Sequence, residues 1–100
     1  MQSVRGRIRR MSFYLVEYEF VPDIINKRLP FREEHLAYAK NHNVILGGAL
    51  DPPKRGILVV NASTPEAVEV LAQNDPYVLN DLVLRYSIHP WNVAINNTKS

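Results

Sequence analysis

The chain has 100 residues, of which 46% are hydrophobic, 22% charged and 9% aromatic, and it contains no cysteine. This length suits one domain, and the composition is that of a globular protein rather than of a disordered, collagenous or coiled-coil chain. The lack of cysteine excludes disulfides, zinc–cysteine sites and thiol nucleophiles. No apolar stretch approaches the roughly 20 residues of a membrane-spanning helix, so a membrane is not an expected partner.

The positive charge lies at the amino-terminal end. Lys and Arg number 12 and Asp and Glu number 10, but four of the arginines fall in an acid-free stretch over residues 1–10. Without these four, eight cations face ten acids, and the rest of the chain has a formal charge of −2. It has no basic stripe with interleaved aromatic residues, so nucleic acid is not an expected partner either.

These patterns divide the chain into a basic extension over residues 1–11, one domain over 12–92 and a carboxy-terminal tail over 93–100. We expect a cytoplasmic protein, because the extension lacks the apolar stretch of a secretory signal. An arginine-rich, acid-free start is also typical of organelle transit peptides, which leaves a mitochondrial location as the alternative.

Periodicity predicts six main elements in chain order. Residues 12–20 alternate between two faces, one carrying Tyr14 and the other Phe13, as in a strand. After a loop over 21–30, residues 31–42 have apolar and aromatic side chains at spacings of three and four, as in a helix. The remaining elements are two strands, a helix and a last strand, at residues 44–50, 57–61, 65–74 and 82–90.

The second helix has clear signals at its start and its end. Thr64 is a good N-cap residue, and Pro65 suits the first helical position. Pro76 disfavours a helical conformation in the residue before it, Asp75, so the helix ends there. We expect its buried stripe to consist of Ala67, Val70 and Leu71. The last strand is expected to place four side chains on one face: Leu82, Leu84, Tyr86 and Ile88.

The order βαββαβ predicts a ferredoxin-like α+β sandwich, in which right-handed crossovers place both helices on one face of an antiparallel sheet. The other face would carry side chains such as Tyr14 or Phe13, depending on the register of the strands. An uncovered apolar face is usually an interface. We therefore expect a homodimer in which the two sheets pack face to face around a two-fold axis.

The same topology brings two distant polar residues together. The first helix starts at the end of the domain where the second helix finishes, so His35 approaches Asp75 although 40 residues separate them. A carboxylate that accepts one ring N–H fixes the tautomer of a histidine and makes the other nitrogen a better base. These two residues are the candidate catalytic pair. The alternative is that Asp75 only ends a helix and His35 is a half-buried polar residue.

Four further residues are candidates for substrate binding. Gly47 and Gly48 lie at the same rim and lack side chains, so a ligand can approach their backbone closely. Arg32 and Tyr77 are placed to orient an anionic or phenolic substrate. No two histidines have a metal-ligand spacing, so neither a metal site nor a cofactor is expected.

At these residues the sequence resembles the YciI-like, or YCII-related, family. The resemblance spans about residues 12–92, and the three segments that carry it together are Arg28 to Leu36, Gly47 to Leu50 and Asp75 to Val78. The chain departs from many relatives at Ala49, where they have proline, and in its short loop over 51–54.

The resemblance implies a dimeric α+β barrel of ferredoxin-like subunits. It also implies an active site built on a His and an Asp, which match His35 and Asp75 in this sequence. The family is similar to small isomerases and lyases of aromatic breakdown that use the same barrel.

The leading hypothesis is a proton-transfer isomerase or lyase that acts on a small cyclic or aromatic metabolite without a cofactor. His35 would act as the general base or acid, and Asp75 would orient it. A second hypothesis is a non-catalytic dimer that binds or senses the metabolite in the same pocket. A third is a structural dimer that contacts a protein partner through its basic extension.

Overall fold

The computed structural model describes residues 11–98. The basic extension predicted over residues 1–11 lies outside this range apart from Met11, and so do the last two residues of the predicted tail. The elements follow in the order β1 (Ser12–Phe20), α2 (Ile24–Lys27), η1 (Leu29–Phe31), α3 (Arg32–Lys40), β2 (Val44–Ala49), β3 (Arg55–Ala62), α4 (Pro65–Gln73), α5 (Pro76–Leu79) and β4 (Val83–Trp91).

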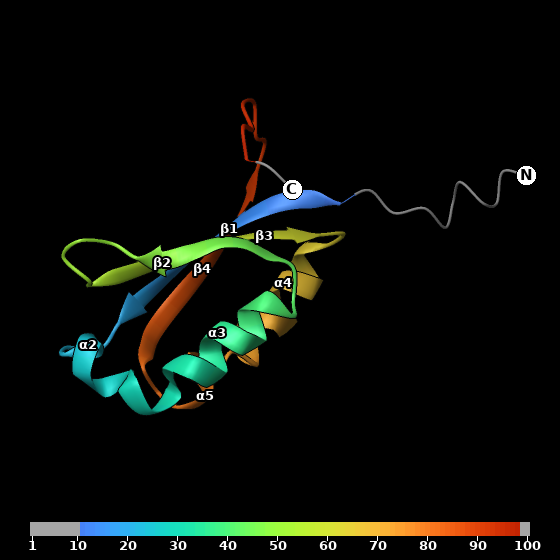
Figure 1. The fold of residues 1–100 in the computed structure, drawn as a ribbon. Helices are drawn as coiled ribbons and strands as arrows, with labels where there is room; N and C mark the ends of the chain where they lie inside the picture. Colours follow the sequence, from blue (N-terminus) through green and yellow to red (C-terminus); the bar gives the residue numbers. More distant parts are fainter. Residues whose placement is uncertain (1–10, 99–100) are drawn as a thin grey trace, which may run out of the picture.

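The four strands form one antiparallel sheet in the order β2-β3-β1-β4. The two longer helices, α3 and α4, lie side by side on one face of this sheet, whereas no helix covers the other face among the residues described (Figure 1). This is the arrangement of a ferredoxin-like α+β sandwich, so the predicted fold class is confirmed. We call the uncovered side of the sheet the open face.

The hydrophobic core lies between the sheet and the helices. Tyr14, Val16, Tyr18 and Phe20 alternate along β1 and are all buried on the helix side. Phe13 and Leu15 lie between them in sequence and therefore point to the open face. The register places Leu15 opposite Val59 of β3 and His89 of β4, so this face carries apolar side chains. The strand register thus settles that the open face carries Phe13, and that Tyr14 belongs to the core.

The predicted start of the second helix is correct, but its predicted buried stripe is wrong. The Thr64 hydroxyl accepts a hydrogen bond from the Ala67 backbone N–H at 3.1 Å, as an N-cap should. The fully buried residues of α4 are Val68 and Ala72, whereas Ala67 is exposed and Val70 is 57% exposed. The helix has apolar residues on adjacent faces, and the face with Val68 and Ala72 is the one that belongs to the core. Of the predicted stripe, only Leu71 packs against the core.

Two connections are more ordered than the sequence indicates. The predicted loop over residues 21–30 contains α2 and most of η1, and Ile24 anchors this segment because its side chain is buried in the core. The extra turn expected after the second helix is the short helix α5. None of the helices in the described part of the chain is long and apolar enough to cross a membrane.

The last strand departs from strict alternation. Phe20 pairs with Val83 and Glu19 pairs with Arg85, so the register shifts and Leu84 has no partner on β1. This irregularity turns Leu84 outward, where it is 57% exposed, and the prediction that it shares one face with Leu82, Tyr86 and Ile88 is wrong. Tyr86 and Ile88 both pack against the core, so these two do share one face.

Candidate active site

The structure brings His35 and Asp75 together. His35 lies in the first turn of α3, and Asp75 lies just after α4, at the same end of the domain. The His35 Nδ1 atom is 2.7 Å from the Asp75 Oδ1 atom, although 40 residues separate the two. His35 is 9% exposed and Asp75 is 1% exposed. The antiparallel course of α3 and α4 therefore produces a buried imidazole–carboxylate pair.

Three hydrogen bonds hold the Asp75 carboxylate. Its Oδ1 atom accepts the Tyr77 backbone N–H at 2.9 Å as well as the His35 contact, and its Oδ2 atom accepts the Tyr18 hydroxyl at 2.8 Å. An ionised carboxylate can only accept hydrogen bonds. The proton shared with His35 therefore sits on Nδ1, and in the neutral imidazole the Nε2 atom keeps its lone pair.

Two tyrosines contact this pair. The Tyr77 ring stacks on the His35 ring with centroids 3.7 Å apart and planes 6° from parallel. Burial raises the pKa of Tyr18 far above its ordinary value, and the adjacent Asp75 carboxylate raises it further. The Tyr18 hydroxyl therefore stays protonated and remains a hydrogen-bond donor to Asp75 at any pH that the fold tolerates.

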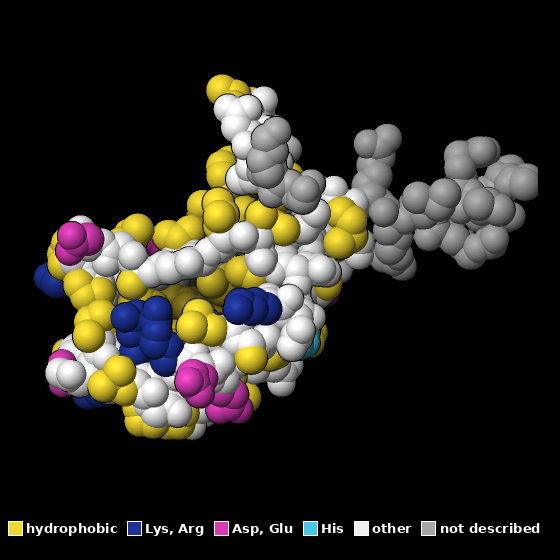
Figure 2. Space-filling view, in the orientation of Figure 1, with side chains coloured by type: hydrophobic (Ala, Val, Ile, Leu, Met, Phe, Trp, Pro, Cys, Tyr) yellow, Lys and Arg dark blue, Asp and Glu magenta, His cyan; other side chains and the backbone are white. Residues whose placement is uncertain are grey.

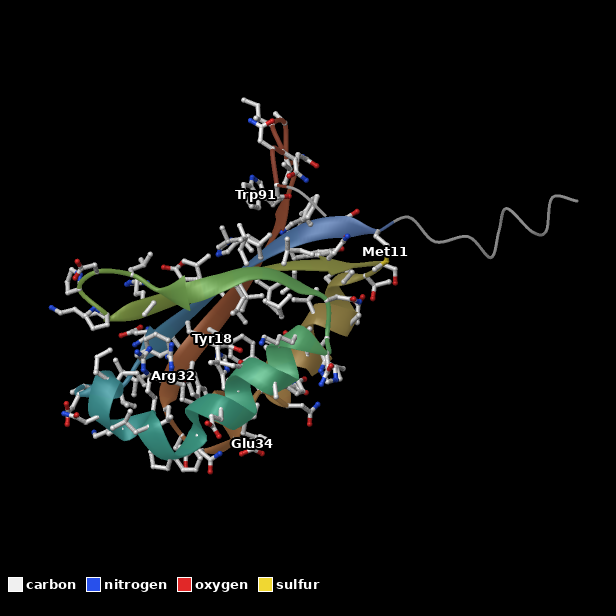
Figure 3. All side chains as sticks on the ribbon, in the orientation of Figure 1. Met11, Tyr18, Arg32, Glu34 and Trp91 are labelled. Carbon is white, nitrogen blue, oxygen red and sulfur yellow. The ribbon has the colours of Figure 1, made fainter. Side chains whose placement is uncertain are left out.

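A cavity of about 480 Å³ lies beside His35, between α3 and the strands β2 and β3. Figure 2 shows this hollow, with hydrophobic side chains inside it and Lys or Arg side chains along its rim. In Figure 3, Tyr18 and Arg32 lie between the sheet and α3, whereas Glu34 lies on the outer side of that helix. Five of the predicted site residues line the cavity: Arg32, His35, Gly47, Gly48 and Tyr77. Asp75 does not line the cavity, but it contacts the Nδ1 atom of His35, which does.

The two predicted glycines differ in what surrounds them. A Cβ atom on Gly47 would lie 2.7 Å from Leu58 Cδ2, so the Leu58 side chain would have to move to admit it. A Cβ atom on Gly48 would meet nothing within 4 Å. Gly56 on β3, which the sequence analysis did not select, is the most crowded of the three, because a Cβ there would lie 2.5 Å from Phe20 Cζ.

Sequence reasoning missed two residues of this site. Tyr18 occupies a core position of β1. Its hydroxyl could have identified it as a site residue, because a buried hydroxyl needs a hydrogen-bond partner. Arg28 lines the cavity and lies four residues before Arg32 and seven before His35. Arg28 begins one of the segments that carry the family resemblance, but it was not selected as a site residue because residues 21–30 were expected to form a loop.

The described residues contain no group of three or more His, Cys, Asp or Glu side chains that could hold a metal ion. The other two histidines lie away from the cavity. His42 is exposed and its Nδ1 atom is 2.7 Å from the Tyr38 carbonyl oxygen. His89 is exposed near Ser87 on β4. His35 is therefore the histidine that contacts both the cavity and a buried carboxylate.

Comparison with solved structures supports the same fold. The dehydrochlorinase TftG of Burkholderia phenoliruptrix, which acts on 5-chloro-2-hydroxyhydroquinone and was solved with 2,5-dihydroxybenzoquinone, is 20% identical, with a TM-score of 0.70 over 80% of this chain and 93% of that one. A Bacteroides thetaiotaomicron protein assigned to the antibiotic biosynthesis monooxygenases is 11% identical, with a TM-score of 0.60 over 91% of this chain and 96% of that one. At these identities the likeness shows the fold alone.

No curated protein matches the chain. The family model for the YCII-related domain matches residues 11–92, which is most of the sequence and nearly all of the described structure. The match also covers His35, Asp75 and every residue named above as lining the cavity. The protein therefore belongs to the family of YCII-related domains.

Proposed function

We propose that this protein catalyses a proton transfer on a small cyclic or aromatic metabolite, as an isomerase or a lyase. The observation that carries the proposal is a histidine on a cavity wall whose Nδ1 atom is bound to a buried carboxylate at 2.7 Å. With the Nδ1 proton held by Asp75, Nε2 is the ring nitrogen left to act as the general base.

The chemistry needs one base and a place for the proton to go. The His35 Nε2 atom would take a proton from a C–H or O–H group of the ring, and Asp75 would stabilise the imidazolium that forms. In an isomerisation His35 returns this proton to another ring atom. In an elimination the electrons of the broken C–H bond form the new double bond, and the leaving group departs with the electrons of its own bond. Arg32, Gly47, Gly48 and Tyr77 would contact the substrate.

The structural neighbour TftG supports this class of reaction. Its name describes the removal of chlorine and hydrogen from a hydroxylated ring, and it was solved with a dihydroxybenzoquinone. The turnover experiment below distinguishes an isomerase from a lyase. We further propose that the protein acts as a homodimer in the cytoplasm, with the mitochondrion as the alternative location.

A first experiment tests the pair itself by NMR of isotope-labelled protein. In the wild-type chain the ring nitrogens of His35 should report a proton on Nδ1 and a bare Nε2. In Asp75→Asn the amide no longer enforces this tautomer, and we expect the His35 signals to change while those of His42 and His89 stay in place. Unchanged His35 signals in Asp75→Asn would contradict the proposed role of the pair.

A second experiment tests turnover. Lactones and hydroxylated aromatics are incubated with the protein in deuterated water, and deuterium incorporation or product formation is followed for the wild type and His35→Asn. Loss of turnover in the variant supports the proposal. Binding without turnover by the wild type favours the second candidate, a sensing dimer. In such a dimer Asp75 would have a structural role only, because its Oδ1 atom caps α5 by accepting the Tyr77 backbone N–H.

A further inference from the structure

The cavity beside His35 combines cationic side chains with an apolar wall. We infer that its occupant carries an anionic oxygen, either a carboxylate or a phenolate, which binds to Arg28 and Arg32 while the ring lies on the apolar wall. This inference rests on the proposed function for the role of the pocket and deepens it by naming the charge of the substrate.

The charge of the cavity is the first observation. Arg28, Arg32 and Lys40 line it, and none of its described lining residues is acidic. Within residues 11–98, none of the three takes part in an ion pair. On the open face, in contrast, Arg55 and Arg85 each bind a glutamate, Glu17 and Glu19 respectively. Cations gathered around a partly apolar hollow without counter-ions attract an anion.

Two unpartnered polar atoms are the second observation. The Arg28 Nε atom and the Tyr77 hydroxyl are enclosed, and neither has a hydrogen-bond partner among the described residues. Buried polar atoms nearly always have partners, and both of these residues line the cavity. Burial raises the pKa of Tyr77, although Arg28 and Arg32 oppose this effect. The Tyr77 hydroxyl is therefore a donor, and an anionic oxygen would accept hydrogen bonds from it and from Arg28.

The rest of the cavity fits a ring. Its remaining wall is largely apolar, with residues from both layers of the fold: Phe20, Val44 and Leu58 from the sheet, and Leu36 and Ala39 from α3. The volume of about 480 Å³ falls within the range of small-molecule sites. A ligand with an anionic group and an apolar ring fits both the cationic side chains and the apolar wall of the cavity. Such a ligand would place its ring beside His35.

Benzoate and benzamide provide a matched pair of probes, because they have the same shape and differ in charge. We would titrate each into the labelled full-length protein and follow the backbone amides of Gly47 and Gly48 and the Nε–H signal of Arg28. Benzoate should bind at least about tenfold more tightly than benzamide. A second arm compares ionised 4-nitrophenol with nitrobenzene and so distinguishes a phenolate from a carboxylate.

Three variants locate the anion. Arg28→Gln and Arg32→Gln should each weaken benzoate binding about tenfold. Lys27→Gln is the matched control and should leave it unchanged, because Lys27 is exposed, adjoins Arg28 and does not line the cavity. If Arg28→Gln does not fold, Arg32→Gln and the comparison of charged with neutral probes still show whether the cavity prefers an anion.

Equal binding of the charged and neutral probes, or benzoate binding that is insensitive to Arg32→Gln, would overturn the inference. Neither result would bear on the His35 tautomer or on turnover, so the proposed proton transfer would still be judged by its own two experiments. Conversely, anion binding that depends on these arginines in a protein without turnover supports the inference and removes only the catalytic proposal.

Discussion

Asp75 takes part in both the fold and the site. Its Oδ1 atom binds the Tyr77 backbone N–H and thereby caps α5, and the same atom binds His35. Its Oδ2 atom depends on the Tyr18 hydroxyl, which comes from β1, 57 residues earlier. A carboxylate that is 1% exposed needs all of these donors, because water cannot replace a lost one.

The first prediction concerns Tyr18→Phe, which removes one donor and leaves the Asp75 Oδ2 atom buried without a partner. We expect the free energy of unfolding to fall by about 1–3 kcal/mol, as measured by urea denaturation. Tyr14→Phe is the matched control, because Tyr14 is also buried on β1 but donates none of the hydrogen bonds that hold Asp75. Equal losses in the two variants would show that the Tyr18 bond has no special weight.

The second prediction concerns alkaline pH. The pKa of Tyr18 is raised in the folded chain, first by burial and then by Asp75, from an ordinary value of 10.0. Above pH 10 the unfolded chain loses this proton and the folded chain keeps it, so stability is lost as the pH rises. For Tyr18 the loss is about 1 kcal/mol between pH 10 and 11. Between pH 10 and 11 the stability of Tyr18→Phe should fall less steeply than that of the wild type, and parallel curves would contradict this.

At the scale of single elements, the close packing of β3 against β1 decides which glycines are essential. Gly56 lies opposite Tyr18 in the sheet, and the Phe20 ring fills the space where a Gly56 side chain would be. Gly48 borders the same cavity from β2, but a Cβ atom at this position would meet no other atom within 4 Å. The two positions therefore form a natural pair for comparison.

The third prediction is that Gly56→Ala destabilises the fold by about 1–3 kcal/mol, because its Cβ would lie 2.5 Å from Phe20 Cζ and the ring must move. Phe20 also lines the cavity, so ligand binding should weaken as well. Gly48→Ala should be neutral or slightly stabilising, because alanine fits a strand better than glycine does. Thermal unfolding of both variants checks this, and equal destabilisation would count against the steric explanation.

Much of the fold could be predicted from the sequence, because alternation along β1 and the capping residue Thr64 are local signals. The approach of His35 to Asp75 also followed, since the antiparallel course of two helices places their ends together. The face of α4 could not be chosen, because Val68 and Val70 are equally apolar and only contact with the sheet separates them. Tyr18 was missed for a similar reason, since its partner lies 57 residues away.

At the scale of the whole molecule, the open face of the sheet is the surface with no covering layer among the described residues. It carries apolar side chains from all four strands: Phe13, Leu15, Leu46, Val59 and Trp91. Beyond β4 the chain stands away from the sheet on this same side, and its Ile95 side chain is 80% exposed (Figure 1). A second copy of the chain would cover these groups, as in the dimeric barrel that the family resemblance implies.

The fourth prediction is that sedimentation equilibrium at micromolar concentration gives twice the chain mass of 11.5 kDa. Leu15→Arg should shift the protein towards the monomer, because it places a charge in the paired apolar surface. Val70→Arg is the control, because Val70 is 57% exposed on α4, in the helical layer. A wild-type protein that remains at 11.5 kDa would contradict the pairing of two sheets.

The position of Trp91 makes the chain its own optical probe. It is the single tryptophan of the sequence, it ends β4 on the open face, and 43% of its surface is exposed (Figure 3). An indole in water emits at longer wavelength than one enclosed by protein. The emission wavelength of Trp91 therefore reports, without any label, whether the open face is exposed to water or covered by a second copy. It can be measured at protein concentrations far below those that sedimentation equilibrium requires.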